Sequence, residues 1–217
     1  WVGNVEQLNL EAAGVQTERS YVVVDDTLRT SNPRIYAAGD VNGRMMLVQS
    51  ASSEARLAVE NALLGNEKTF RHHVVPHGGF TDPEYGSVGL TEAEALAQGG
   101  CAIAAVPYSD LDRAVIDGRA EGFCKLIVNR ESGQIVGAHV VGEQAVEVVQ
   151  IVAAGMAAGM HVLELAELEL AYPTFTAVVG LAARQLVRQL GFTPLAAEWR
   201  TLRRLQNRTA EWENSSA

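Results

Sequence analysis

The 217-residue sequence lacks most of the patterns that mark specialised sites. Its two cysteines, Cys101 and Cys124, form no CxxC pair, no zinc-ligand spacing and no disulfide framework. It contains neither a GxGxxG nor a GxxxxGKS/T motif, so it has no dinucleotide fingerprint and no P-loop of its own. HExxH and GxSxG are also absent, which excludes the helical zinc-protease motif and the nucleophile elbow.

Basic residues are scarce as well. Lys and Arg number 17 against 26 Asp and Glu, which gives a formal net charge of −9. A general nucleic-acid-binding surface needs a basic stripe, so we expect no nucleic-acid partner. The longest mostly apolar stretch, residues 146–170, is interrupted by Gln150, His161 and several glutamates. It predicts a buried helical region and no membrane span.

The N-terminal residues have no basic segment followed by an apolar run, and the chain has no initiator methionine. We therefore expect no signal peptide, and we expect the chain to be the C-terminal part of a longer polypeptide. Because the cysteines form no disulfide pattern, a reducing, cytoplasmic compartment is the simplest expectation.

Hydrophobic residues make up 47% of the chain, enough for a sizeable core. In the first third, a short helix is predicted over residues 5–13. A longer helix is predicted over 48–64, because apolar residues recur there with helical spacing. Short β-branched or apolar stretches at 21–24 and 35–38 predict strands. The largely polar stretch 67–77 then predicts a linker.

The second part of the chain has a different pattern. Strands are predicted over residues 87–90, 101–108, 123–129 and 135–141, and helices over 91–98, 143–158 and 174–190. Thr91 and Glu94 have the spacing of a capping box. Several strands followed by a helical run favour an α+β fold, in which an antiparallel sheet has helices on one side.

The segment with most chemical content is residues 29–40, RTSNPRIYAAGD. A short strand that ends in Gly39-Asp40, with a helix soon after, places a carboxylate beside a helix N-terminus. The carboxylate can accept hydrogen bonds from a sugar-like polyol, and the free N–H groups of the helix suit an electron-rich oxygen. Taken alone, Gly-Asp after a strand is more often a simple turn.

Residues 29–40 resemble the second flavin-binding motif of the FAD- and NAD(P)-dependent pyridine nucleotide-disulfide oxidoreductases, which include dihydrolipoamide dehydrogenase, glutathione reductase and mercuric reductase. Residues 80–92 resemble the opening of the dimerisation domain of that family, residues 123–142 its central hairpin, and Pro173-Thr174 its last helix. The resemblance extends from residue 5 to about residue 190.

The resemblance implies a domain organisation and partners. Residues 1–66 would be the C-terminal part of an FAD-binding α/β domain, and residues 70–190 the dimerisation domain; we expect residues 191–217 to form a helical tail. The implied cofactors are FAD and, through a missing N-terminal part, NAD(P)H. The implied partners are a second copy of the chain and a small-molecule electron acceptor. Two apolar helix faces, at 143–158 and 175–190, are compatible with such a homodimer.

The resemblance also assigns site residues where the sequences match. Asp40 would bond the ribityl chain of FAD, and Gly39 would allow close approach of the backbone. The backbone amides at Met46, Leu47 and Val48 would face the pyrimidine part of the flavin from the start of the next helix. The side chains of Met46 and Leu47 are expected to pack in the core.

The sequence departs from the family where the acid–base chemistry lies. Dihydrolipoamide dehydrogenase and glutathione reductase have a His-Pro pair and, five residues after the His, a Glu that orients the ring while the His moves a proton. Here Tyr172 and Ala177 stand at those positions. A phenol with an ordinary pKa of about 10 is a poor base at neutral pH, but it can donate a hydrogen bond. Tyr172 is therefore the candidate catalytic residue, with a purely structural hydroxyl as the equal alternative.

Three functions remain open from the sequence. The first is a C-terminal fragment of a dihydrolipoamide dehydrogenase-like oxidoreductase, inactive by itself. The second is a mercuric-reductase-like or quinone- or metal-reducing flavoprotein without the His-Glu dyad, although the adjacent C-terminal cysteines of mercuric reductase are absent. The third is a non-catalytic dimerisation module. No metal site is predicted, because His72 and His73 have no further ligand nearby.

Overall fold

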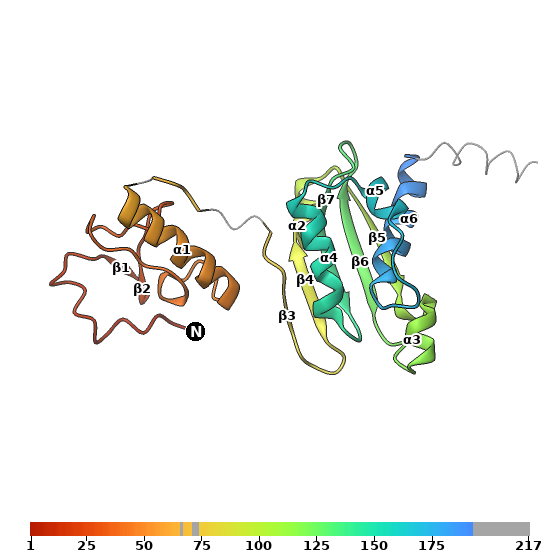
Figure 1. The fold of residues 1–217 in the computed structure, drawn as a ribbon, viewed down its shortest axis with the longest axis horizontal. Coiled ribbons are helices and arrows are strands. Elements are labelled where there is room, and N and C mark those ends of the chain that lie inside the picture. The colour runs from red at the N-terminus through yellow and green to blue at the C-terminus, as the bar shows by residue number, and fades with distance from the viewer. Residues whose placement is uncertain (66, 71–73, 193–217) are drawn as a thin grey trace, which may run out of the picture. The chain divides into compact units, whose positions relative to one another are not determined.

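The computed structural model describes residues 1–65, 67–70 and 74–192 (Figure 1). These residues form two compact units that divide between Val75 and Pro76, within the stretch predicted as a linker. His72 and His73 lie outside the described residues, and so does the predicted helical tail after residue 192.

The first unit contains one long helix and little other regular structure. Its elements are β1 (Thr17–Glu18), β2 (Tyr21–Val22), the 3-10 turn η1 (Asp40–Asn42) and α1 (Val48–Leu64). The helix predicted over 48–64 is confirmed as α1. It ends at Gly65, which takes the left-handed conformation that stops a helix.

The shorter predictions for this unit are wrong or too long. Residues 5–13 form successive turns, with Asn9 at a φ of 48° that no right-handed helix accommodates. The strand predicted over 21–24 is reduced to β2, and residues 35–38 form no strand. The carbonyl of Ile35 accepts the N–H of Thr30 at 2.9 Å, and the N–H of Ala37 donates to the carbonyl of Leu28 at 3.1 Å. The segment therefore closes a local turn and joins no ladder.

The second unit is built on a five-stranded antiparallel sheet with strand order β3-β4-β7-β6-β5. The strands are β3 (His77–Gly79), β4 (Tyr85–Gly89), β5 (Cys101–Pro107), β6 (Phe123–Asn129) and β7 (Ile135–Val141). The predicted bounds of β6 and β7 are confirmed. Strand β3 was not predicted, because two of its three residues are glycines, which carry no β signal.

One face of this sheet forms the core of the unit. Cys124, Leu126 and Val128 alternate along β6 on this face, and all three are fully buried. Helix α4 (Ala145–Ala157) contacts β4 and β7, α6 (Ala177–Leu190) contacts β5 and β6, and α5 (Val162–Glu167) packs on α6 (Figure 1). The predicted class, an α+β fold with helices against one side of an antiparallel sheet, is confirmed.

The two apolar helix faces that were compatible with a dimer are covered within the unit. Val148 and Val152 of α4 are buried, and so are Val178, Ala182 and Leu186 of α6. The faces predicted over 143–158 and 175–190 therefore pack mainly on the sheet of their own chain. A partner would have to use other surfaces.

Three short helical elements connect the strands: α2 (Glu92–Gln98), η2 (Tyr108–Asp110) and α3 (Asp112–Ile116). The predicted capping box of α2 is confirmed. The Thr91 hydroxyl accepts the Glu94 N–H at 3.3 Å, and the Glu94 carboxylate accepts the Thr91 N–H at 2.8 Å, which lowers the pKa of Glu94. Within the described part of the chain, no helix is both long and apolar enough to cross a bilayer.

Candidate functional site

The Gly39-Asp40 turn is held tightly against α1. Gly39 has a φ of 80°, and a Cβ built on it would lie 3.0 Å from Cβ of Ala51, so conformation and space both require glycine there. The carbonyl of Gly39 accepts the N–H of Asn42 at 3.0 Å, which closes η1. Gly39 is buried and Asp40 is exposed. The turn therefore presents the Asp40 carboxylate at the surface of the first unit.

The start of α1 is the second part of the candidate site. Leu47 is extended, with φ −135° and ψ 140°, and the helix begins at Val48 without a side-chain cap. A helix begins with N–H groups that its own carbonyls cannot satisfy, and its positive dipole end favours an electron-rich ligand atom. The Val48 side chain is 83% exposed. This end of α1 is thus open to a ligand.

The expected core packing is wrong for Met46 and only partly met by Leu47, which is half-buried. Met46 is exposed, and its sulfur receives a long 3.8 Å contact from the Tyr21 hydroxyl. The described residues leave the surface around Met46 and Val48 exposed. Any role of these two residues in a flavin site would use their backbone.

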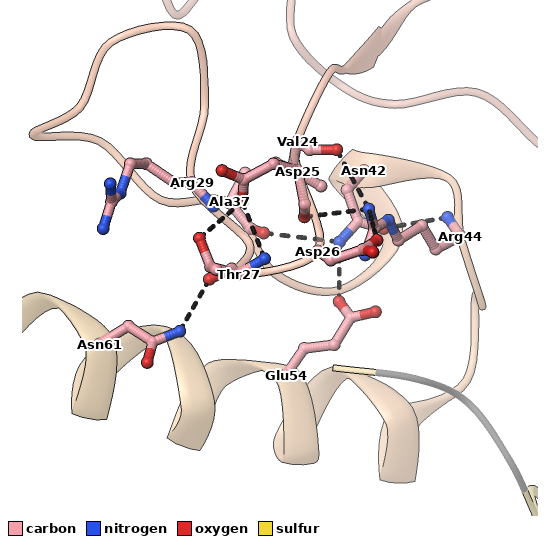
Figure 2. A network of polar contacts seen from close by, with 10 residues as sticks. All are labelled: Val24, Asp25, Asp26, Thr27, Arg29, Ala37, Asn42, Arg44, Glu54 and Asn61. Atoms are coloured by element: carbon pink, nitrogen blue, oxygen red, sulfur yellow. Dashed lines mark hydrogen bonds and ion pairs between the residues drawn. The ribbon is translucent and has the colours of Figure 1, made fainter. Parts of the chain in front are cut away.

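A polar network joins the loop at 24–29 to Arg44, shortly after the turn (Figure 2). One carboxylate oxygen of Asp25 accepts from the N–H and hydroxyl of Thr27 at 2.8 and 2.6 Å, and from the N–H of Arg29 at 3.1 Å. Burial opposes ionisation of Asp25, but these hydrogen bonds outweigh it and lower its pKa. The Arg44 guanidinium donates to the carbonyls of Val24 and Asp25 at 3.1 and 3.0 Å. The loops behind Asp40 are therefore tied together through main-chain and charged groups.

Tyr172 belongs to the second unit, in the loop that precedes α6. Its ring is 76% exposed, and its hydroxyl donates a 2.8 Å hydrogen bond to Oδ2 of Asp112 on α3. That hydrogen bond, together with the negative charge of Asp112, raises the pKa of Tyr172. The phenol is therefore held in its neutral form as a hydrogen-bond donor.

Tyr172 and Asp112 line one cavity of about 220 Å³. Ala177, which stands where the resemblance places a glutamate, also lines it, together with Arg113 and Arg184. Asp112 was missed by the sequence analysis. It lies 60 residues before Tyr172, on a different element, so no local spacing could have linked the two.

The two free cysteines differ in burial. Cys124 is fully buried in β6, and burial raises its pKa to about 12, so its thiol is inert. Cys101 is partly exposed at the start of β5. Among the described residues, no group of three or more His, Cys, Asp or Glu side chains is arranged to hold a metal ion.

Comparison with known proteins gives two matches to family descriptions. Residues 75–183 match "Pyridine nucleotide-disulphide oxidoreductase, dimerisation domain", and residues 2–55 match "Pyridine nucleotide-disulphide oxidoreductase". The division between the two matches coincides with the division between the two units.

Similar proteins and structures agree with these matches. The chain is 39% identical over 180 residues to a mercuric reductase of Streptomyces lividans. These residues make up 82% of this chain and 38% of the relative. It is 35% identical over 191 residues to a dihydrolipoyl dehydrogenase of Chlorobaculum parvum, covering 87% and 40%. The crystal structure of LpdA from Mycobacterium tuberculosis superposes with a TM-score of 0.78 at 31% identity, over 85% of this chain and 41% of that one. The chain thus spans about two fifths of the length of these proteins.

Proposed function

Because the chain belongs to the pyridine nucleotide-disulphide oxidoreductase family, we propose that it is the C-terminal part of an FAD-dependent NAD(P)H oxidoreductase and supplies part of the flavin site and the dimer interface. One observation carries this proposal: two matched regions of the family, residues 2–55 and 75–183, follow each other on two separate compact units. The share of about two fifths of the relatives' length agrees with a chain that supplies only part of such an enzyme. We place the protein in the cytoplasm, because its two free cysteines suit a reducing compartment.

The first unit offers groups that fit part of a flavin. The exposed carboxylate of Asp40 can accept hydrogen bonds from a polyol chain, and the uncapped start of α1 offers N–H groups to a ring oxygen. Gly39, Met46, Leu47 and Val48 contribute through their backbone. A bound FAD would supply the two-electron chemistry that connects a nicotinamide to an acceptor.

The second unit contributes Tyr172 on the side of the electron acceptor. The phenol of Tyr172 is protonated at neutral pH, so it cannot serve there as the proton-accepting base. Its one O–H is donated to Asp112, so Tyr172 would act on an acceptor by turning that O–H away from Asp112. This favours, as a second candidate, a mercuric-reductase-like or quinone- or metal-reducing flavoprotein, whose small-molecule acceptor needs no His-Glu dyad. The presence of Ala177 in the same cavity is the observation that supports it.

The dimer interface is assigned to exposed apolar side chains near Tyr172. Val115 and Ile116 lie on α3 beside Asp112, and both are exposed, as are Leu168 and Tyr172 itself. Exposed apolar groups of this kind mark interaction sites, and a two-fold dimer covers the same patch on both subunits. We therefore propose a homodimer that uses α3 and the loop before α6.

The experiment that tests the flavin assignment is Asp40→Ala in the longer polypeptide that carries the preceding part of the fold. Loss of a charged acceptor from a partly desolvated site costs about 1.5–3 kcal/mol, or roughly a ten- to hundredfold weaker FAD affinity. Glu6→Ala, which removes an exposed carboxylate of the same unit, is the control. Unchanged FAD retention after Asp40→Ala would count against the assignment of Asp40. Absence of FAD from the unmutated longer polypeptide would instead favour a non-catalytic dimerisation module.

A further inference from the structure

Helix α1 buries a polar face. Its buried residues are Ser50, Glu54, Ala58 and Asn61, and three of these four are polar. Their spacing of three or four residues places them on one side of the helix. Several apolar side chains of the same helix, among them Val48, Val59 and Leu63, are exposed. The inward face of α1 is therefore made for hydrogen bonding to a loop.

Glu54 is the most deeply placed of these polar residues. It has 0% exposure, and a carboxylate removed from water is costly unless hydrogen bonds compensate it. One of its oxygens, Oε2, accepts the backbone N–H of Gly39 at 2.7 Å. The same oxygen accepts the side-chain amide of Asn42 at 2.8 Å (Figure 2). Hydrogen bonds to an ionised acceptor are roughly twice as strong as neutral ones. Glu54 therefore holds the turn from below with two strong bonds.

The two bonded groups lie on either side of Asp40. Gly39 precedes it, and Asn42 follows two residues later, at the end of η1. Asn42 is held in addition by its own Oδ1, which accepts the N–H of Arg44 at 2.9 Å. Within the described residues, no hydrogen bond or ion pair holds the Asp40 carboxylate itself. Its direction is consequently set by the backbone of the turn, and that backbone is fixed by Glu54.

We propose that Glu54 is a positioning residue, which orients the Asp40 carboxylate toward the polyol part of FAD without touching the cofactor. The inference rests on the proposed flavin role of Asp40. It adds a residue that no sequence motif of the chain singled out, 14 positions after Asp40, on the buried side of α1. The carboxylate of Glu54 thus links helix α1 to the Gly39–Asn42 turn, the two elements to which we assign flavin contacts.

Variants of Glu54 in the longer FAD-binding polypeptide separate a positioning role from bulk stability. Glu54→Gln keeps a carbonyl oxygen for both donors, so we expect FAD affinity within about threefold of the parent. Glu54→Ala leaves both donors without their acceptor, so we expect FAD affinity to fall about tenfold or more, with a changed visible circular dichroism of the bound flavin. Glu60→Gln is the matched control: Glu60 lies on the same helix, but pairs with Lys68 at the surface and should leave both readouts unchanged.

A second pair of variants applies if Glu54→Ala does not fold. Asn42→Asp sets a carboxylate against Glu54, and should weaken FAD binding. Adding Glu54→Gln to Asn42→Asp supplies an amide donor to the new carboxylate while the Gln oxygen still accepts from Gly39, and should restore binding. Such restoration measures coupling between the two side chains. Failure of the double variant to recover FAD affinity, in folded protein, overturns the proposal.

Hydrogen exchange of the Gly39 amide distinguishes failure of this proposal from failure of the proposed function. It is measured on the 217-residue chain without FAD, where Glu54→Ala should speed exchange at Gly39. Faster Gly39 exchange with unchanged FAD affinity and flavin spectrum overturns the positioning role. If instead Asp40→Ala leaves FAD binding unchanged, the flavin assignment fails, whatever the exchange at Gly39 shows.

Discussion

The hydroxyl of Tyr172 donates a 2.8 Å hydrogen bond to Oδ2 of Asp112, and so joins the loop before α6 to α3 across 60 residues of sequence. The family's catalytic histidine is partnered by a glutamate five residues later; in this chain that position is Ala177. The carboxylate partner comes from a different element, and the proton stays on the phenol. We propose that Tyr172, paired with Asp112, stands where the resemblance places the histidine of the family's basic pair.

The first prediction concerns the pH at which Tyr172 ionises. The hydrogen bond to Asp112 and its negative charge favour the neutral phenol, so the pKa of Tyr172 lies above its ordinary value. Asp112→Asn should lower that pKa toward about 10. Ultraviolet difference titration checks this, with Tyr172→Phe as the reference to be subtracted. Equal midpoints in parent and Asp112→Asn would contradict the pairing.

The same shift sets the sign of its effect on stability. A phenol whose pKa is raised on folding stabilises the native state fully below the pKa of the unfolded chain, about 10. That contribution is lost as the pH rises through the folded-state pKa. The parent should therefore lose more stability than Asp112→Asn on going from neutral to strongly alkaline pH, as measured by denaturant unfolding.

A second prediction separates the two halves of the proposed reaction. In the longer enzyme, Tyr172→Phe should slow electron transfer to the acceptor while leaving the reduction of bound flavin by NAD(P)H unchanged. The reason is that the hydroxyl is assigned to the acceptor side. Stopped-flow measurement of each half-reaction checks it, with Tyr85→Phe, an exposed tyrosine on β4, as the control. If Tyr172→Phe has the same rates as the parent in both half-reactions, Tyr172 has only a structural role.

The third prediction concerns the thiols. Because burial raises the pKa of Cys124 to about 12, almost none of it is thiolate near neutral pH, and its side chain is inaccessible to reagents. Iodoacetamide should therefore label the native chain once, at Cys101, and label it twice after unfolding in denaturant. Mass spectrometry counts the labels, and Cys101→Ser should remove the native label. Two labels on the folded protein would show that the core around β6 opens readily.

Local signals explain which parts of the fold could be predicted. The hairpin of β6 and β7 consists of two stretches rich in Val and Ile around a glycine-containing turn, and α2 carries its own capping box. Each of these features is encoded within a few neighbouring residues. Asp40 could be named as a candidate for the same reason, since the whole motif lies in one continuous stretch.

Long-range contacts explain what could not be predicted. The apolar spacing of α1 correctly predicted a helix, but its buried side is the polar one, because Glu54 and Asn61 bind loop backbone. Asn61 donates to the carbonyls of Thr27 and Lys68 at 3.0 and 2.9 Å. Neither this docking nor the contact between Tyr172 and Asp112 leaves a periodic trace in the sequence. Both become visible only when the loops are placed in space.

The central claim, that this chain carries the dimerisation part of a flavoenzyme of its family, is tested most directly by sedimentation velocity of the 217-residue chain at low micromolar concentration. We predict a single species of twice the 23.3 kDa chain mass, which Ile116→Glu converts to monomer by placing a charge in the apolar patch of α3. A parent chain that sediments only as a 23.3 kDa monomer would contradict the claim.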